Sequence, residues 1–265
     1  MTMTWSVQVY CVANDEAILR RNLQASPDIA GGPIELSVIW GAKAASVAYR
    51  EAVARAHADV VVFAHQDVYF PEGWFSQLNV ACERLSSADP CWAVAGLCGM
   101  TNDGEFVGHL WDAGLGAVCG APFDVPRQVT SLDEVVLILR RASEISFDPG
   151  LPSFHLYGTD IVLEAHRLGM KSYAINLPVI HNSKAGVRLD GTYVAAYRFM
   201  VQKWRVLLPL PTVIVRLTRN PLPLLLRGLR LRYKALLRAS TLHPMVESPE
   251  SIARELGFAA REDCV

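Results

Sequence analysis

The first 65 residues alternate between strand-like and helix-like segments, and this alternation constrains the fold more than any other feature of the chain. Apolar runs of strand length occupy 5–12, 34–39 and 59–64, and apolar residues recur at helical spacing in 15–24 and 44–57. Segments in this order typically form a parallel sheet with helices packed outside it. The third run, DVVVFA, is continuously apolar, which predicts a strand covered on both faces.

The same pattern continues to about residue 204. The expected elements are a helix over 74–85, a strand over 92–97, a hairpin around Asn102-Asp103-Gly104, a strand over 134–141, a helix over 160–168 closed by Gly169, and a strand over 171–176. Residues 111–133 are rich in Gly and Pro, and we expect an irregular, exposed excursion there.

The chain changes character after Arg198, and prolines at 209, 211, 221 and 223 interrupt Leu-rich runs there. We therefore predict an α/β fold in two parts. Residues 1–204 form a single domain with a mostly parallel central sheet, and 205–265 form a basic, Leu/Pro-rich helical appendage. With 51% hydrophobic and 19% charged residues, the chain can bury a sizeable core.

Charge is distributed unevenly along the chain. Residues 1–190 contain 21 Asp/Glu against 13 Lys/Arg, a net charge of -8, whereas 191–246 contain ten Lys/Arg and no acidic residue. Such asymmetry indicates that the C-terminal part meets something anionic, such as phosphates, a lipid surface or nucleic acid.

The six cysteines include no C-x-x-C pair, and several lie in apolar runs where a thiol behaves as a small hydrophobe. This indicates a reduced, cytoplasmic protein. The N-terminal residues carry neither an early positive charge nor a long apolar core, so we expect no signal peptide.

Polar groups follow three of the expected strands: Asn14-Asp15-Glu16, His65-Gln66-Asp67 and His181-Asn182. In an open α/β sheet, ligands collect at the carboxyl ends of the parallel strands. A Gly-x-Gly-x-x-Gly fingerprint after the first strand and a Walker-type phosphate loop are both missing from the sequence. Dehydrogenase and NTPase functions are therefore disfavoured.

His65 and Asp67 project from one face of an extended segment, because side chains alternate with a period of two. An imidazole and a carboxylate in this arrangement could bind Mn²⁺ or Mg²⁺ together with phosphate oxygens. The alternative is that Asp67 caps the helix that begins near Trp74 or satisfies a turn.

Two blocks of sequence resemble a known family. VVVFAHQDVYFPEGWFSQL and FHLYGTDIVLEAHRLGMKSYAINLPVIHNS are similar to segments of family-two glycosyltransferases, closest to a bacterial branch related to the streptomycin-biosynthesis StrF proteins. The resemblance covers about residues 7–204. It implies a GT-A fold, a nucleotide-sugar donor and a divalent metal, Mn²⁺ or Mg²⁺.

The resemblance also implies roles for individual residues. Asp67 matches the second acidic position of a D-x-D motif, which coordinates the metal that bridges the donor diphosphate. His65 replaces the first Asp, and His181 matches a histidine that completes the metal site or binds the diphosphate. Asp160 matches the carboxylate that serves as general base in inverting members. The alternative for Asp160 is helix capping, since Thr159 and Asp160 are both good N-caps.

Five further residues are candidate donor contacts. Asp15 and Glu16 match the region that contacts the nucleoside, although acidic residues also suit the first turn of a helix. Lys43 is a candidate phosphate partner or a solvated surface lysine. Lys203 and Trp204 resemble a basic-Trp pair on a flexible loop that closes over the diphosphate.

The segment around Trp40 departs from the family pattern. Many relatives have an acidic segment there that touches the nucleotide, whereas this chain has Trp40-Gly41-Ala42-Lys43-Ala44. Trp40 could stack on a base or belong to the core.

The leading interpretation is an inverting, metal-dependent transferase of sugar from a UDP- or GDP-linked donor to a saccharide, lipid-linked or small-molecule acceptor. The alternatives are a non-catalytic nucleotide-sugar-binding protein and a nucleotidyltransferase. We expect no nucleic-acid partner. The basic segment 205–238 predicts either contact with the inner face of the membrane or an appendage that packs on the domain or on a second copy in a homodimer.

Overall fold

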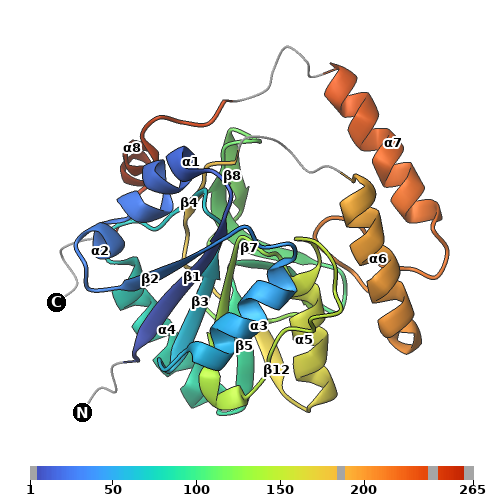
Figure 1. Ribbon diagram of the computed structural model, residues 1–265, viewed down its shortest axis with the longest axis horizontal. Coiled ribbons are helices and arrows are strands. Elements are labelled where there is room, and N and C mark those ends of the chain that lie inside the picture. Colours follow the sequence, from blue (N-terminus) through green and yellow to red (C-terminus); the bar gives the residue numbers. More distant parts are fainter. Residues whose placement is uncertain (1–4, 184–188, 238–243, 260–265) are drawn as a thin grey trace.

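The computed structural model describes residues 5–183, 189–237 and 244–259. Its central sheet has seven strands, in the order β2 (Glu35–Trp40), β1 (Val7–Ala13), β3 (Val60–Ala64), β11 (Val136–Arg140), β5 (Trp92–Gly96), β12 (Lys171–Ala174) and β9 (Arg127–Gln128). Figure 1 shows β1 and β3 near the middle of the molecule, with helices around them.

Most of the strands in this sheet point the same way. β1 is parallel to β2 and β3, and β12 is parallel to β5. β11 is antiparallel to both β3 and β5, which makes those two strands parallel to each other. The predicted α/β class with a mostly parallel central sheet is therefore confirmed. All five residues of β3 are buried, as its continuous apolar run predicts.

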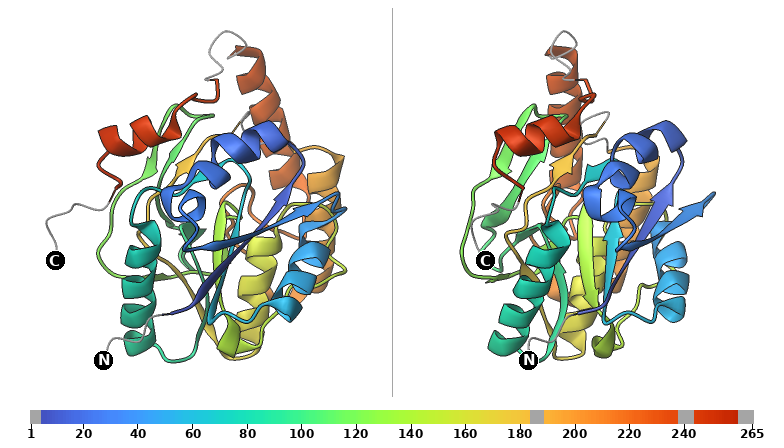
Figure 2. Two further views of the ribbon diagram at one scale, coloured as in Figure 1. Left: turned by 60° about the vertical axis from the view of Figure 1, so that its left-hand side comes forward. Right: turned by 90° about the vertical axis from the view of Figure 1, so that its left-hand side faces the viewer.

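Helices cover both faces of the sheet (Figures 1 and 2). They are α1 (Glu16–Arg21), α2 (Pro27–Ala30), α3 (Ala45–Arg55), α4 (Trp74–Ala88), α5 (Tyr157–Arg167) and α6 (Gly191–Lys203). One core cluster joins β3 residues Val61 and Phe63 to α3, α5 and α6. The other joins Val60 and Val62 to α1 and α4. The alternation of side chains along β3 thus divides the core in two.

A second sheet lies beside the carboxyl ends of the central strands. Its order is β10 (Ser131–Leu132), β6 (Cys98–Met100), β7 (Phe106–Asp112), β13 (Ile180–His181) and β4 (Val68–Tyr69), and β8 (Ala117–Gly120) pairs with β7. β6 and β7 are antiparallel, which confirms the expected hairpin. The prediction of an irregular, exposed 111–133 is wrong in part, because it contains β8, β9 and β10 and buries Val129 and Leu132.

Helix α5 begins at Tyr157, three residues before the position expected from sequence. Its N-cap is Leu156, whose φ of 64° lies in the left-handed region and whose side chain cannot cap. Thr159 and Asp160 therefore lie inside the first turn, and the capping interpretation of Asp160 is wrong. The end of the helix is as predicted, since Gly169 has a φ of 78°.

The C-terminal part contains α7 (Leu222–Leu237) and α8 (Pro249–Glu255). Leu217 and Leu224 belong to the core cluster of α3, α5 and α6, while Ala253 and Phe258 pack against Tyr69, Trp111 and Ile180. The division of the chain at residue 204 stays a prediction.

In the described ranges, no helix has both the length and the apolar character needed to cross a bilayer. The five cysteines in these ranges are free thiols. Cys264 and Arg238, the end of the basic segment, lie outside the described residues.

Candidate functional site

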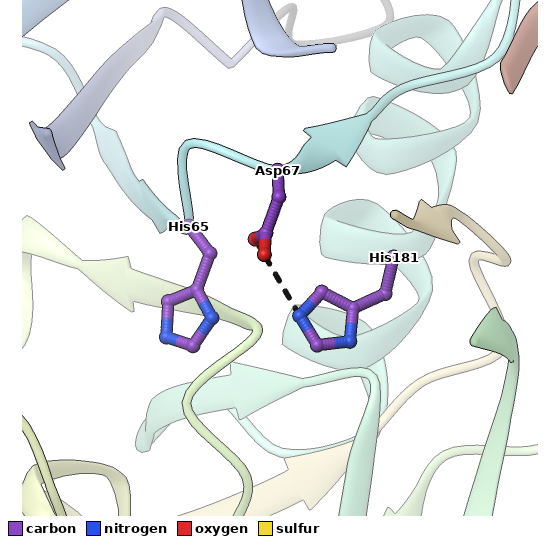
Figure 3. Close-up of side chains that lie close together, drawn as sticks. All are labelled: His65, Asp67 and His181. Atoms are coloured by element: carbon purple, nitrogen blue, oxygen red, sulfur yellow. Dashed lines mark ion pairs between the residues drawn. The ribbon is translucent and has the colours of Figure 1, made fainter. Parts of the chain in front are cut away.

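Three of the residues predicted from sequence meet at one place. His65, Asp67 and His181 each offer a ligand atom, and these atoms lie within 4.8 Å of one another. Figure 3 shows the carboxylate of Asp67 above two imidazole rings that come from different segments. Within the described ranges, this is the group whose geometry could hold a metal ion.

The main chain positions these side chains. β3 ends at Ala64, and the N–H of His65 donates to the carbonyl of Val135 at 3.1 Å. In β13, His181 pairs with Val68 of β4 on one side and with Asp112 of β7 on the other. The N–H of Asn182 donates to the carbonyl of Asp67 at 2.8 Å, so the two segments are joined directly beside the site.

His181 is held by a carboxylate on each side. Its Nδ1 lies 2.8 Å from Oδ2 of Asp112, and its Nε2 lies 3.5 Å from Oδ1 of Asp67. Burial disfavours a charged imidazole, but Asp67 and Asp112 outweigh it and raise the pKa of His181 to about 10. Burial acts to raise the pKa of Asp67, yet His181 and His65 lower it to about 2.

His65 is oriented by a tyrosine. Its Nε2 lies 3.2 Å from the hydroxyl of Tyr157, which donates its own proton to the carbonyl of Glu134 at 3.3 Å. The hydroxyl must therefore accept a hydrogen bond from Nε2–H, which leaves Nδ1 of His65 unprotonated. Burial lowers the pKa of His65, so this imidazole is neutral at neutral pH.

These groups suit a divalent cation. Oδ1 of Asp67 is buried and makes no hydrogen bond within the described part of the chain. Each histidine presents one ring nitrogen to this atom and holds the other on a second residue, as metal-binding histidines usually do. Imidazole nitrogens favour a transition-metal ion, so Mn²⁺ fits the set better than Mg²⁺. The alternative role of Asp67 as a cap of α4 is wrong, because the N-cap is Gly73.

Gln66 connects the site to the end of β1. Its side-chain oxygen accepts from the N–H groups of Asn14 and Asp15 at 3.0 Å, and its amide donates to the side chain of Asn14. The side chain of Asp15 caps α1 by accepting from Ile18 N–H, and Glu16 forms an ion pair with Arg20 on the same helix. The nucleoside contacts expected of Asp15 and Glu16 stay predictions.

Trp40 and Lys43 lie at the carboxyl end of β2. Trp40 is 51% exposed, so its interpretation as a core residue is wrong and its ring is available for stacking. Lys43 is also exposed, on the loop between β2 and α3. Its role as a phosphate partner stays a prediction.

The remaining predicted residues, Asp160, Lys203 and Trp204, form a second cluster one turn along α5 from Tyr157. The ammonium of Lys203 lies 2.9 Å from Asp160, and the indole N–H of Trp204 donates to Oδ1 of Asp160 at 2.7 Å. Lys203 and Trp204 thus lie at the end of α6, whereas the resemblance predicted a flexible loop. Asp160 is 2% exposed, and burial raises its pKa despite these partners.

Lys203 also binds two other carboxylates, Asp148 at 2.7 Å and Glu164 at 2.9 Å. Burial disfavours its charge, but the three carboxylates outweigh it and raise the pKa of Lys203. Any role of Asp160 as a base requires it to exchange one of its partners for an acceptor hydroxyl.

Three residues beside the metal candidates were not anticipated from sequence. Asp112 ends β7, Tyr157 begins α5, and the carboxyl of Glu134 interacts with the N–H groups of Leu156 and Gly158. Burial raises the pKa of Glu134 well above its ordinary value. Asp112 had a signal in the sequence, since it follows the apolar run FVGHLW just as Asp67 follows DVVVFA.

Comparison with known proteins gives distant similarities. No protein-family model matches the chain. The chain is 30% identical over 161 residues to the ATP synthase subunits region ORF 6 protein of Fuscovulum blasticum. This similarity covers 59% of the chain and 64% of that protein, so the chain spans less than two thirds of its relative.

Three solved structures are similar at low identity. The mannosyltransferase PcManGT from Pyrobaculum calidifontis, in complex with GDP-Man and Mn²⁺, has a TM-score of 0.48 and 10% identity over 98% of this chain and 82% of that chain. A197 from STIV has a TM-score of 0.39 and 12% identity over 64% of this chain and 81% of that one. S. aureus TarS 1–349 has a TM-score of 0.38 and 14% identity over 68% of this chain and 59% of that one. Likenesses this distant assign no function to the chain.

Proposed function

We propose that the chain is a glycosyltransferase that moves a sugar from a nucleoside diphosphate to a hydroxyl acceptor and depends on a divalent cation. The observation that carries this proposal is the convergence of His65, Asp67 and His181 within 4.8 Å. It lies where the carboxyl end of β3 meets β13, the edge at which open α/β sheets bind ligands. The resemblance of the segments around these residues to family-two glycosyltransferases supports the same function.

Each residue of the site has a distinct part in this proposal. Asp67, His65 and His181 hold the cation, Mn²⁺ in preference to Mg²⁺. When bound, the cation supplies positive charge that stabilises the departing nucleoside diphosphate. Asp112 and Tyr157 orient the two imidazoles. Trp40 and Lys43 are offered to the nucleoside and the diphosphate from the end of β2, and Asp15 and Glu16 are offered to the nucleoside from the start of α1.

The finer features of the proposal rest on the resemblance. It implies inversion at the anomeric carbon, with Asp160 accepting the proton of the acceptor hydroxyl. The donor is then UDP- or GDP-linked, and the acceptor is a saccharide, a lipid-linked molecule or a small molecule. The proposed location is cytoplasmic, as expected from the cysteine pattern of the sequence.

Release of nucleoside diphosphate tests the proposal. Wild-type protein is incubated with a panel of UDP- and GDP-sugars and a panel of saccharide, lipid-linked and small-molecule acceptors, with Mn²⁺ or EDTA. Asp67→Asn is compared with Asp124→Asn, which changes an exposed aspartate. We expect Mn²⁺-dependent release that Asp67→Asn abolishes and Asp124→Asn keeps. Full activity of Asp67→Asn with Mn²⁺ would show that the site is assigned wrongly.

One observation favours a second candidate, a nucleotide-sugar-binding protein without transferase activity. Both oxygens of Asp160 are engaged by Lys203 and Trp204, which leaves little room for a general base. Asp160→Asn distinguishes the candidates. In a transferase it keeps donor binding and loses turnover, whereas in a binding protein no turnover is measured for the wild type across the acceptor panel.

A further inference from the structure

Helix α7 carries an apolar stripe that faces solvent. Five large residues are between 48% and 64% exposed: Leu222, Leu225, Leu226, Leu229 and Tyr233. At about 100° per residue, their spacing places all five within a stripe about 100° wide. Leu224, on the opposite side of the helix, is buried in the core cluster. The helix is therefore anchored by one side and leaves an apolar side uncovered.

Arginines flank this stripe. Arg230 and Arg232 are exposed and lie about 80° to either side of its centre. Residues 191–246 contain ten Lys/Arg and no acidic residue. An apolar stripe between cationic borders is the pattern of helices that lie in the interface of a membrane.

The stripe continues into a groove between α6 and α7. The groove has a volume of about 1110 Å³, and its walls include Val194, Tyr197, Val201, Leu225 and Leu229. Four exposed arginines also line it: Arg198, Arg205, Arg219 and Arg232. Asp190 lines the groove as well, so the rim carries four positive charges against one negative charge. An apolar trough with this net positive rim suits the acyl chain and phosphate of an anionic lipid.

We propose that α6 and α7 dock the protein on an anionic lipid bilayer, with the stripe in the interface and an acyl chain in the groove. Charge decides between a bilayer and a second copy of the chain. A symmetric dimer through this face would bring the arginines of one copy close to those of the other, and like charges repel there. A bilayer rich in anionic lipid neutralises the same arginines. Figure 1 shows α7 at the margin of the molecule beside α6.

Vesicle sedimentation tests the docking with the full chain and needs no enzymatic activity. Wild type is mixed with vesicles of phosphatidylcholine alone or of phosphatidylcholine with anionic phosphatidylglycerol, whose negative surface potential attracts basic segments. We expect binding to the anionic vesicles that weakens with salt. Leu225→Gln with Leu229→Gln should lower the partition coefficient at least about tenfold, and Arg230→Gln with Arg232→Gln about 25-fold, at about fivefold per arginine.

Matched variants serve as controls. Leu115→Gln with Leu168→Gln changes two leucines that are 53% and 52% exposed on other elements, and Arg84→Gln with Lys171→Gln removes two exposed charges elsewhere. These should bind as wild type does. The proposal would be overturned if the α7 variants bound as tightly as the wild type, or if the wild type did not bind. A stable dimer that the leucine variant converts to monomer would overturn it as well.

Discussion

Asp112→Asn tests the orientation of His181. In the wild type, Oδ2 of Asp112 accepts from Nδ1 of His181 at 2.8 Å, and Oδ1 accepts from the N–H of Leu115 at 3.0 Å. Asparagine has one oxygen and can satisfy only one of these donors. If the asparagine oxygen keeps the hydrogen bond from the N–H of Leu115, the asparagine NH₂ group faces Nδ1 of His181. Nδ1 must then accept a hydrogen bond. The single proton of the neutral ring then lies on Nε2, the nitrogen that a metal needs.

The size of the effect follows from this geometry. Loss of the residue that orients a metal-binding histidine typically lowers metal affinity 10–100-fold, or about 1.4–2.7 kcal/mol. We expect Asp112→Asn to weaken Mn²⁺ binding by this factor while the fold is retained, since the substitution changes almost no volume. Titration followed by electron paramagnetic resonance of free Mn²⁺ measures the affinity, and a melting curve without metal monitors the fold.

The control for this experiment is Asp124→Asn, an exposed change with the same loss of charge. It should leave Mn²⁺ affinity within about twofold of the wild type, because exposed charges away from a site are screened. Unchanged Mn²⁺ affinity in a folded Asp112→Asn protein would refute the reasoning that Asp112 fixes the tautomer of His181.

Three further predictions follow from the structure. Lys203→Met leaves three carboxylates without their shared cation and should destabilise the fold by about 3–5 kcal/mol; an unfolding midpoint as high as that of the surface control Lys43→Met would contradict this. Trp40→Ala should weaken nucleoside diphosphate binding by about 1–3 kcal/mol with no change in melting temperature, if the ring stacks on the base; calorimetry checks it, and wild-type affinity would remove Trp40 from the site. The carboxylates of Asp67 and Asp112 raise the pKa of His181 to about 10, so Mn²⁺ must displace a proton from this imidazole. The affinity for Mn²⁺ should therefore rise about tenfold per pH unit between about pH 6 and pH 8; a pH-independent affinity would exclude His181 as a ligand.

The fold was predictable where apolar runs are long. The run DVVVFA predicts a strand on any interpretation. The polar residues that follow it, His65 and Asp67, were therefore expected at the edge of the sheet. Three strands between residues 117 and 132 were missed. β8 forms a hairpin with the preceding strand β7, whereas β9 and β10 have only two residues each and pair with β12 and β6, which are distant in sequence. A local pattern does not encode such pairings.

The site was predictable as a set of ligands but not as a network. The position of α5 depends on Leu156, which adopts a left-handed conformation that no sequence rule assigns to leucine. Tyr157 therefore reaches His65, and Asp160 turns toward Lys203 and Trp204. Tertiary packing decides which partner each polar group contacts. For this reason the residues predicted from sequence form two clusters in the structure.

The main-chain hydrogen bond from Asn182 to Asp67 and the pairing of His181 with Val68 have a consequence for how the protein responds to a cation. The proposed ligands are assembled by the sheet itself, so no part of the chain would have to fold around an arriving ion. A melting curve should therefore keep one cooperative transition with and without Mn²⁺. Its midpoint should rise smoothly with metal concentration, as expected when an ion selects a site that is already built.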